Sequence, residues 1–371
     1  YFEELIEKNF LSNNHRLKVT LSGDPDFNKK NDKKEKEKLA KIRESMSPEE
    51  VDDLKKDLYA FEKVQREEDD LTLLPELSLG DIKKTVQKND PFVKEKDISI
   101  YKKDIGNLHY YMNIYSLNDL DDTLMGALPS FSYLFDKLCT KKRSSAELLK
   151  KLDIYSGGLS ASESAMHSFS SGGGVLKYFI LHSYYLEKNS QKVMGLINEI
   201  IEEIDLSNKT KIENLLQVLY TRYMASVLDD GHNYAALMAL APKNELANIS
   251  NRWQGLEQIL TLKKTLKAFA EGDYSSLADL KKISDYIRER AENEIALIGE
   301  KNFAMEIEKS KTRTKTEEKD REKFYTGENL RTGIALPTNV SFVVVAKQAP
   351  SIAEPDAAAL MVAAKLLSRS F

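Results

Sequence analysis

Hydrophobic and polar residues follow two different spacings along this chain. Segment 15–25, "HRLKVTLSGDP", alternates apolar and polar side chains and ends in a Gly-Asp-Pro turn, which is typical of a strand followed by an exit loop. Segments such as 208–228 and 275–290 instead repeat apolar residues at helical intervals. Strand pairs separated by long helical segments favour an α+β fold, in which helices pack on one face of a sheet.

The same spacings predict the other elements of the chain. Further strands are expected at 97–104, 107–117, 157–170, 174–186, 294–300 and 339–347. Helices are expected at 124–139, 145–155, 190–204, 208–228, 232–241, 249–270, 275–290 and 302–323. The last of these helices is almost entirely charged outside Phe303, Met305 and Ile307.

Residues 28–70 differ in character from the rest, because they form two charge-dense helical runs. Ser47 as N-cap, Pro48 at the first helical position and Glu50 as capping-box partner mark the start of the second run. A narrow apolar stripe follows it, at Leu54, Leu58, Phe61 and Val64. This pattern predicts a solvent-exposed helical hairpin between domains, closed by an extended apolar strip at 71–82.

Composition narrows the class of protein. At 371 residues, with 41% hydrophobic and 31% charged residues, the chain can form two or three domains with cores of their own. The net charge of -4 gives no global footprint for nucleic acid. The single cysteine, Cys139, excludes an internal disulfide and a thiolate metal cluster, which fits a reducing or organellar compartment. No run of about eighteen apolar residues occurs, so no membrane span is expected.

Both ends of the chain have helical patterns. The chain opens with "YFEELIEKNFL" and stops within the apolar helix "DAAALMVAAKLLSRSF" (356–371). We therefore expect the chain to be a piece of a longer polypeptide, which would also lack any N-terminal targeting peptide.

The histidines do not form a local metal motif. Helical zinc sites need histidines at fixed short spacings, because only such side chains project towards one ion. No two histidines here have that spacing, although a site assembled from distant ones stays an alternative. For His109 and His182 we favour a strand histidine with one hydrogen bond. The histidines are His15, His109, His167, His182 and His232.

Other candidate motifs favour structural interpretations. The glycine-rich run 170–175 lacks the lysine of a phosphate-binding loop and predicts a hairpin turn, and Ser156-Gly157-Gly158 lacks the order of a nucleophile elbow. The lysine runs at 29–41 and 309–323 alternate with carboxylates, which would repel phosphate, so solvated helix faces are expected. Trp253 and Tyr223 are expected to be packing residues.

Carboxylates, a glycine and a histidine interrupt the apolar run "SVLDDGHNYAALMA" (226–239). This composition is compatible with a catalytic or metal site, but also with a corner between two helices. We favour the corner, in which Gly231 relieves the backbone after Asp229-Asp230 and His232 bonds backbone carbonyls.

Five motifs in order resemble one peptidase family. They are "LLPELSLGDI", "DKLCTKKRSSAELLKKLDIYSGGLSAS", "GHNYAALMALA", "ISNRWQGLEQI" and "LPTNVSFVVVAK", between residues 73 and 347. Their order is similar to the presequence protease–falcilysin branch of the pitrilysin (insulinase-type) zinc metallopeptidases. The Lys/Asn-rich insertions make falcilysin the nearer resemblance.

The resemblance implies a domain arrangement and a division of labour. Members have four related α+β domains in two halves, joined by a helical hairpin, which close like a clamshell around an unfolded peptide. Residues 1–22 would end the second domain, 23–97 would be the hairpin linker, 98–325 the third pitrilysin-type domain, and 326–371 the beginning of the fourth. The zinc ligands of the inverted H-x-x-E-H motif belong to the first domain and match no position here. No catalytic or metal residue is therefore expected in this segment, and its substrate-binding residues are unknown.

The function that the resemblance implies is that of a C-terminal-half segment of a zinc metalloendopeptidase. Zn²⁺ would be bound by the N-terminal half, and this half would form chamber wall and hinge around unfolded peptides such as transit peptides or haemoglobin fragments. The compartment would be the mitochondrion, the plastid or the digestive vacuole. One alternative is a non-catalytic scaffold subunit of the same fold, like respiratory-complex core proteins. Another is an unrelated helical adaptor that uses the 32–70 hairpin.

Overall fold

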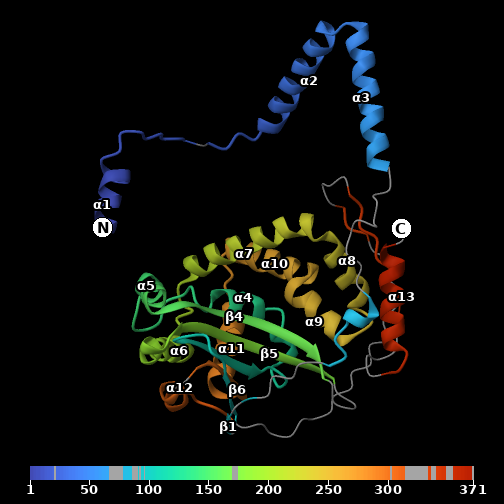
Figure 1. Cartoon of the computed structure of the whole chain (residues 1–371). Coiled ribbons are helices and arrows are strands. Elements are labelled where there is room, and N and C mark those ends of the chain that lie inside the picture. The colour runs from blue at the N-terminus through green and yellow to red at the C-terminus, as the bar shows by residue number, and fades with distance from the viewer. Residues whose placement is uncertain are drawn as a thin grey trace. The chain divides into compact units, whose positions relative to one another are not determined.

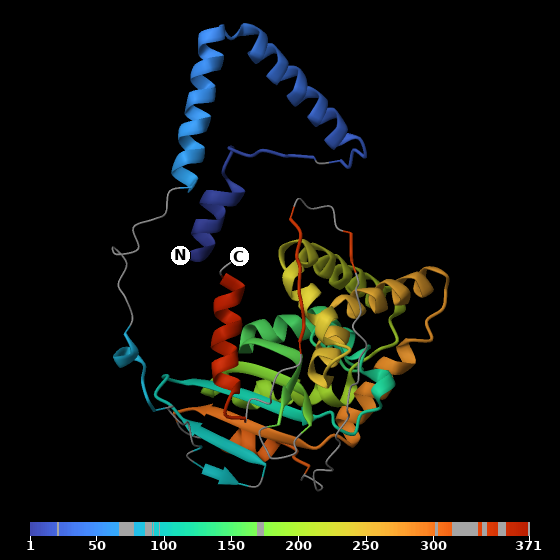
Figure 2. The same cartoon turned by 90° about the vertical axis from the view of Figure 1, so that its right-hand side faces the viewer.

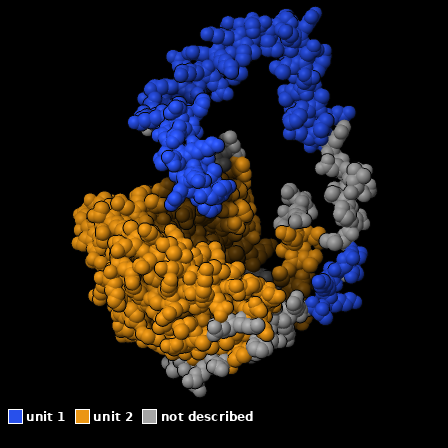
Figure 3. All heavy atoms as spheres, turned by 60° about the vertical axis from the view of Figure 1, so that its left-hand side comes forward, with its two compact units in different colours: residues 1–86 blue, residues 87–371 orange. Residues whose placement is uncertain are grey.

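The computed structural model describes residues 1–20, 22–66, 78–85, 91, 93–95, 97–168, 174–300, 303–313, 333–335, 340–347 and 354–369 (Figure 1). They belong to two compact units, Tyr1–Val86 and Gln87–Phe371, which are coloured separately in Figure 3 and described separately below.

The first unit consists of exposed helices. A short helix α1 (Phe2–Ile6) continues into a π-helical turn (Glu7–Leu11), and the longer helices are α2 (Phe27–Ser45) and α3 (Pro48–Arg66). None of these helices contains a buried residue. A 3-10 turn (Leu79–Asp81) follows, and residues 67–77, which include most of the predicted apolar strip, lie outside the described residues.

The predicted helical hairpin is present, and its second helix, α3, begins at Pro48, directly after the expected N-cap Ser47. The Ser47 backbone N–H donates to Glu50 Oε2 at 2.8 Å, and the Glu50 N–H donates to Ser47 Oγ at 3.2 Å, which completes the capping box. Leu54, Leu58 and the rest of the predicted stripe are exposed. The lysine-rich face of α2 is also exposed, as expected.

The predicted strand at 15–25 is wrong for its described residues. Residues 15–20 and 22–25 form no strand, and Leu17 is 89% exposed. Alternating side chains favour a strand only when a neighbouring strand receives the backbone hydrogen bonds, and no described strand pairs with this segment.

The second unit is built on a six-stranded sheet. Its strands are β1 (Val93–Glu95), β2 (Ile98–Lys102), β3 (Leu108–Ser116), β4 (Ser156–His167), β5 (Val175–Leu186) and β6 (Asn293–Gly299). Their order is β1-β2-β6-β3-β5-β4, and every neighbouring pair is antiparallel except β2 with β6. This mixed but mainly antiparallel sheet confirms the predicted α+β class.

Helices cover one face of this sheet, as Figures 1 and 2 show together. They are α4 (Leu128–Leu134), α5 (Ser145–Tyr155), α6 (Ser190–Glu203), α7 (Lys209–Asp229), α8 (Gly231–Leu240), α9 (Glu245–Gln254), α10 (Leu256–Ala270), α11 (Leu277–Glu289) and α12 (Ala304–Lys309). A further helix, α13 (Ala357–Arg369), is exposed along most of its length. None of the described helices has the length and apolarity needed to cross a membrane.

The core lies between the sheet and these helices. Phe179 on β5 contacts the rings of Phe131 and Phe135, with centroid distances of 5.7 and 5.6 Å. All three side chains are at most 1% exposed. Alternation along β3 and β5 therefore places one set of side chains in this core and leaves the other set on the open face of the sheet.

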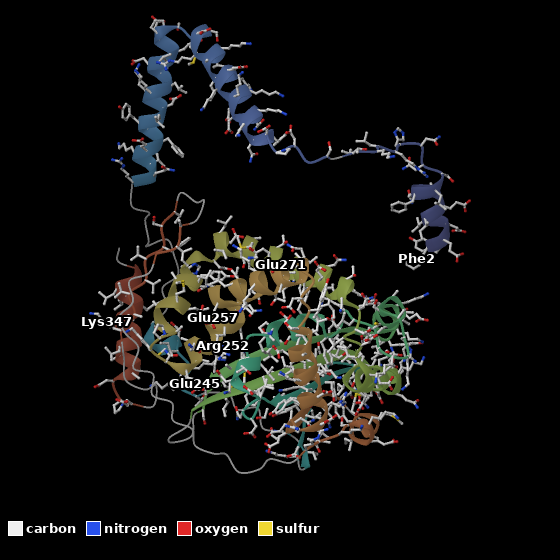
Figure 4. All side chains as sticks on the ribbon, turned by 180° about the vertical axis from the view of Figure 1, so that it is seen from behind. Phe2, Glu245, Arg252, Glu257, Glu271 and Lys347 are labelled. Atoms are coloured by element: carbon white, nitrogen blue, oxygen red, sulfur yellow. The ribbon has the colours of Figure 1, made fainter. Side chains whose placement is uncertain are left out.

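Two predicted helices end earlier than their spacing suggested. The helix expected at 249–270 breaks at Gly255 into α9 and α10, where a Cβ would lie 2.3 Å from Asn251 Oδ1. Arg252 Nε and Glu257 Oε1 lie 3.9 Å apart across this break (Figure 4). The charged helix expected at 302–323 is limited to α12 among the described residues, and 314–323 lie outside them.

The strand expected at 339–347 is also absent from its described part. Residues 340–347 form no strand, with Val343 86% and Val345 78% exposed. Side-chain exposure does alternate along the segment, since Phe342 and Val344 are half-buried between exposed neighbours. However, no described strand lies beside the segment to accept the hydrogen bonds of a ladder.

Candidate functional site

The histidines are spread over the structure. His109 lies on β3, His167 and His182 lie on β4 and β5, His232 lies on α8, and His15 belongs to the first unit. Within the part of the chain that the structure describes, no three His, Cys, Asp or Glu side chains are grouped so as to hold a metal ion. The described residues therefore do not fit a zinc site.

One buried group of polar side chains has the residue types of a catalytic centre. Glu306 on α12 is fully buried, and its Oε1 lies 2.7 Å from His109 Nδ1. The same oxygen accepts hydrogen bonds from Ser190 Oγ at 2.8 Å and from the Tyr185 hydroxyl at 3.1 Å. We call these four residues the Glu306 cluster.

Electrostatics favour the ionised form of this carboxyl group. Burial by itself would raise the pKa of Glu306, but the hydrogen bonds from His109 and Ser190 outweigh it and hold the pKa below its usual range. Burial and the neighbouring carboxylate raise the pKa of Tyr185, so its phenol stays protonated and donates.

The geometry of the Glu306 cluster favours a structural role. A nucleophilic serine needs a base that is free to accept its proton, whereas the acceptor of Ser190, Glu306 Oε1, is shared with His109 and Tyr185. The carboxylate is also closed to substrate, because its side chain is 0% exposed. The cluster therefore fastens α12 to β3, β5 and the start of α6.

Sequence reasoning missed this cluster because the expected helix at 302–323 was characterised only as almost entirely charged, and nothing in that pattern distinguishes Glu306 from its neighbours. In the structure Glu306 is buried, while Met305 and Ile307 are 37% and 36% exposed. The donors to Glu306 come from segments more than one hundred residues earlier, so no local pattern reveals them.

Residues after α12 are tied to the domain by a second set of bonds. Asn293 Nδ2 donates to Asn113 Oδ1 at 2.8 Å and to the Lys311 carbonyl at 2.9 Å. The Arg313 guanidinium donates to the Ile287 carbonyl in the last turn of α11 at 3.4 Å and to the Ala291 carbonyl just after this helix at 3.3 Å. A basic side chain at this end also complements the helix dipole.

A cavity of about 460 Å³ lies beside the Glu306 cluster. It is lined by Asn107, Leu186, Glu187, Lys188, Ser190 and Met305. Ser190 reaches both the cavity and Glu306, but the lining brings no further acid or base of the cluster to the cavity surface.

The stretch at 226–239 is a helix corner, as predicted, but its glycine has a different role. Helix α7 ends at Asp229 and α8 begins at Gly231, which does not have a positive φ. A Cβ on Gly231 would lie 2.4 Å from the Phe342 ring, so glycine is needed for this close approach. The His232 ring lies 6.1 Å from that of Phe342.

Other expected packing residues are confirmed. Trp253 is 4% exposed and its Nε1 donates to the Met125 carbonyl at 3.0 Å, and the Tyr223 hydroxyl donates to the Trp253 carbonyl at 3.2 Å. His182 is bonded to Ser160 Oγ at 2.7 Å, as expected for a strand histidine. The glycine-rich turn itself falls on 169–173, outside the described residues, between the antiparallel strands β4 and β5.

Comparison with known proteins decides the family. The family model that matches residues 21–265 describes the region associated with peptidases of family M16, subfamily C. The chain belongs to this family. The match confirms the predicted presequence protease branch of the pitrilysin-type peptidases, whereas the falcilysin-like assignment stays a prediction.

Curated relatives of this family member include presequence proteases. The mitochondrial presequence protease of Schizosaccharomyces pombe is 24% identical over 390 residues, which cover 100% of this chain and 38% of that protein. Protein HypA of Clostridium perfringens is 25% identical and covers 92% of this chain and 36% of its own length. The mouse mitochondrial presequence protease is 23% identical over 71% of this chain and 26% of its own. The chain thus spans well under half the length of these relatives.

Solved structures that resemble the chain share low sequence identity with it. A protease from Helicobacter pylori is 15% identical, with a TM-score of 0.41 over 66% of this chain and 55% of that one. A peptidase M16 inactive domain from Pseudomonas fluorescens is 11% identical, with a TM-score of 0.36 over 55% and 44%.

Proposed function

We propose that this chain is the C-terminal-half segment of a zinc metalloendopeptidase that degrades short unfolded peptides inside a closed chamber. The observation that carries the proposal is the alignment of the whole chain with a presequence protease more than twice its length, together with the family match over 21–265. In this proposal the second unit supplies chamber wall, and α2 and α3 supply the hinge between halves. The domain boundaries at residues 22, 97 and 325 remain part of the proposal.

The catalytic zinc is assigned to the N-terminal half of the same polypeptide. The described residues offer no ligand set for it, and the buried acid Glu306 is engaged by three donors. No catalytic step is therefore attributed to side chains of this segment. Its contribution is to enclose the peptide and to exclude folded proteins by size.

The names of the relatives support a mitochondrial location and transit peptides as substrates. The chain's resemblance to falcilysin adds haemoglobin fragments and a plastid or vacuolar compartment as further expectations. Unfolded peptides are the substrates in each of these cases, whichever compartment holds the enzyme.

The test is reconstitution of the two halves. The 371-residue chain, the zinc-bearing half encoded upstream, and their mixture are each assayed with a quenched fluorescent peptide, with and without a chelator. Cleavage by the mixture alone, lost on chelation, is expected. Cleavage by the 371-residue chain alone would contradict the proposal.

The upstream sequence separates the enzyme from the scaffold alternative. An intact H-x-x-E-H motif there agrees with a peptidase, because that motif supplies two zinc ligands and the glutamate that activates water. A degenerate motif, with no cleavage by the mixture, would replace the proposal by a non-catalytic subunit of the same fold.

A further inference from the structure

Within the described part of the chain, strand β4 forms one end of the sheet and presents a backbone edge with no neighbouring strand. It pairs with β5 on one side only. Outside that ladder, no backbone–backbone hydrogen bond joins 161–167 to any other described part of the chain. Every second N–H and C=O of this stretch therefore points away from the sheet, with no backbone partner among the residues that the structure describes.

This edge has few of the features that usually protect an exposed strand. Natural edge strands are blocked by lysine, proline or a bulge, because an open edge accepts another extended chain. Ser156–His167 contains no lysine, arginine or proline, and its register shift lies at its start, between Ser156 and Leu159. Its one carboxylate, Glu163, is half-buried, and burial raises its pKa.

On the open face of the sheet, small side chains on β4 stand beside large ones on β5. Ser160, Ser162 and Ser164 are the partners of His182, Ile180 and Tyr178, in that order. Cross-strand partners lie on the same face, and side chains two strands apart can meet over a short residue between them. A strand added beside β4 can therefore lay large side chains over the serines against the β5 row.

On the helical face, the surroundings of β4 are aromatic. Glu163 interacts electrostatically with the Tyr223 hydroxyl on α7, and the neighbouring Arg222 guanidinium lies 5.6 Å from the centroid of the Tyr133 ring. Partly buried tyrosines accept both apolar and hydroxyl-bearing side chains. Residues of an added strand that point to this face can therefore be small and polar.

We propose that the β4 edge binds an extended segment of an unfolded peptide as an additional strand, with large apolar residues at alternate positions. An extended chain is the occupant that satisfies a row of strand N–H and C=O groups, which a helix cannot do. The inference rests on the proposed function, since the peptide is the substrate of the peptidase. The β4 edge is then a second binding site for that substrate, and it lies within the zinc-free segment.

The probe is a fluorescein-labelled peptide in which leucine and threonine alternate, and its binding to the full chain is followed by anisotropy. Ser162→Lys places a charged side chain on the exposed edge and is expected to weaken binding about tenfold or more. Ser99→Lys is the matched control, because Ser99 lies on the same face of the sheet but on β2. It is expected to bind the probe like the unmodified chain.

Backbone methylation of the probe tests the pairing directly and needs no protein variant. Methyl groups on every second nitrogen in one register remove the hydrogen bonds to β4 and are expected to abolish binding, whereas the other register is tolerated. Equal binding of both methylated probes, or equal effects of the two lysine variants, would overturn the proposal. A dimer that dissociates in Ser162→Lys, with no probe binding, would overturn it in favour of pairing between two copies.

The outcome is separable from that of the reconstitution assay. Binding is measured on the zinc-free segment alone and requires no cleavage. Cleavage by the reconstituted halves, with both methylated probes bound equally, rejects only the β4 site. Register-dependent binding without cleavage by the halves rejects only the peptidase.

Discussion

Removing the Glu306 carboxylate tests whether the buried cluster holds α12 to the domain. Oε1 of Glu306 meets three donors, from His109, Tyr185 and Ser190, at 2.7, 3.1 and 2.8 Å. In Glu306→Ala all three donors stay buried without this acceptor, and a cavity is left. In Glu306→Gln the shape is kept but the charge is lost.

The expected costs follow from the geometry. Leaving a buried donor without its acceptor costs about 1–3 kcal/mol, so a loss of about 4 kcal/mol is expected for Glu306→Ala, in which three donors lose theirs. A hydrogen bond to a charged group contributes about 1 kcal/mol more than a neutral one, so losing the charge at three bonds costs about 3 kcal/mol in Glu306→Gln. The exposed Glu308 on the same helix is the control, and Glu308→Ala is expected to stay within about 0.5 kcal/mol.

Fluorescence of the single tryptophan, Trp253, gives the assay, because it is buried in the same unit as the cluster. Thermal and urea unfolding of the three variants are compared with those of the unmodified chain. A loss of about 4 kcal/mol corresponds to a fall in midpoint of at least about 8 °C. Equal unfolding midpoints for Glu306→Ala and Glu308→Ala would refute the idea that the Glu306 cluster holds α12 to the domain.

The stabilisation from the Glu306 cluster is also expected to depend on pH. The pKa of Glu306 is lower in the folded than in the unfolded chain, so its stabilisation is fully present above the unfolded value of about 4.5. It is lost as pH falls through the lowered folded pKa. The stability difference between the unmodified chain and Glu306→Gln is therefore expected to shrink below about pH 4.5. A difference that grows on acidification would show that the sign is wrong.

Five further substitutions probe the packing. Gly231→Ala is expected to lower the free energy of unfolding, because its Cβ would clash with the Phe342 ring, and Phe342→Ala in the same chain is expected to remove this clash. Gly195→Ala is the control, because a Cβ there meets no atom within 4 Å in α6. It is expected to raise the free energy of unfolding in urea by about 0.5–1 kcal/mol. Asn244→Ala removes the N-cap of α9, whose side chain accepts a 2.7 Å bond, and is expected to cost about 1 kcal/mol by the same measurement. Trp253→Phe removes a buried indole donor and is expected to cost about 1–3 kcal/mol, measured by circular dichroism; a neutral result would contradict the 3.0 Å bond.

Local patterns were sufficient where neighbouring residues determine the structure. The capping box at Ser47 and Glu50, the hairpin helices, and the strands over 107–117 and 174–186 are all confirmed. In each case the signal lies within a few residues, as a cap or an apolar spacing.

Predictions failed where distant contacts decide the outcome. Glu306 is buried because three donors from other elements converge on it, although its neighbours in sequence are charged. Gly231 makes room for a ring from residue 342, which no local rule reveals. Segments 15–25 and 339–347 have strand-like alternation, but a strand also requires a partner. The absence of a local zinc motif could be read from histidine spacing, whereas the tie of α12 to the sheet could not.

The position of β6 in the sheet has a consequence for biosynthesis. β6 lies between β2 and β3, yet it is made almost two hundred residues after β2. At ribosomal speeds of about 5–20 residues per second, the central slot stays empty for about 10–40 seconds while the intervening helices emerge. During that interval the two open sides of the slot can accept foreign strands. A nascent chain of this topology therefore exposes unpaired strand edges, which are prone to aggregation, until residue 299 has left the exit tunnel.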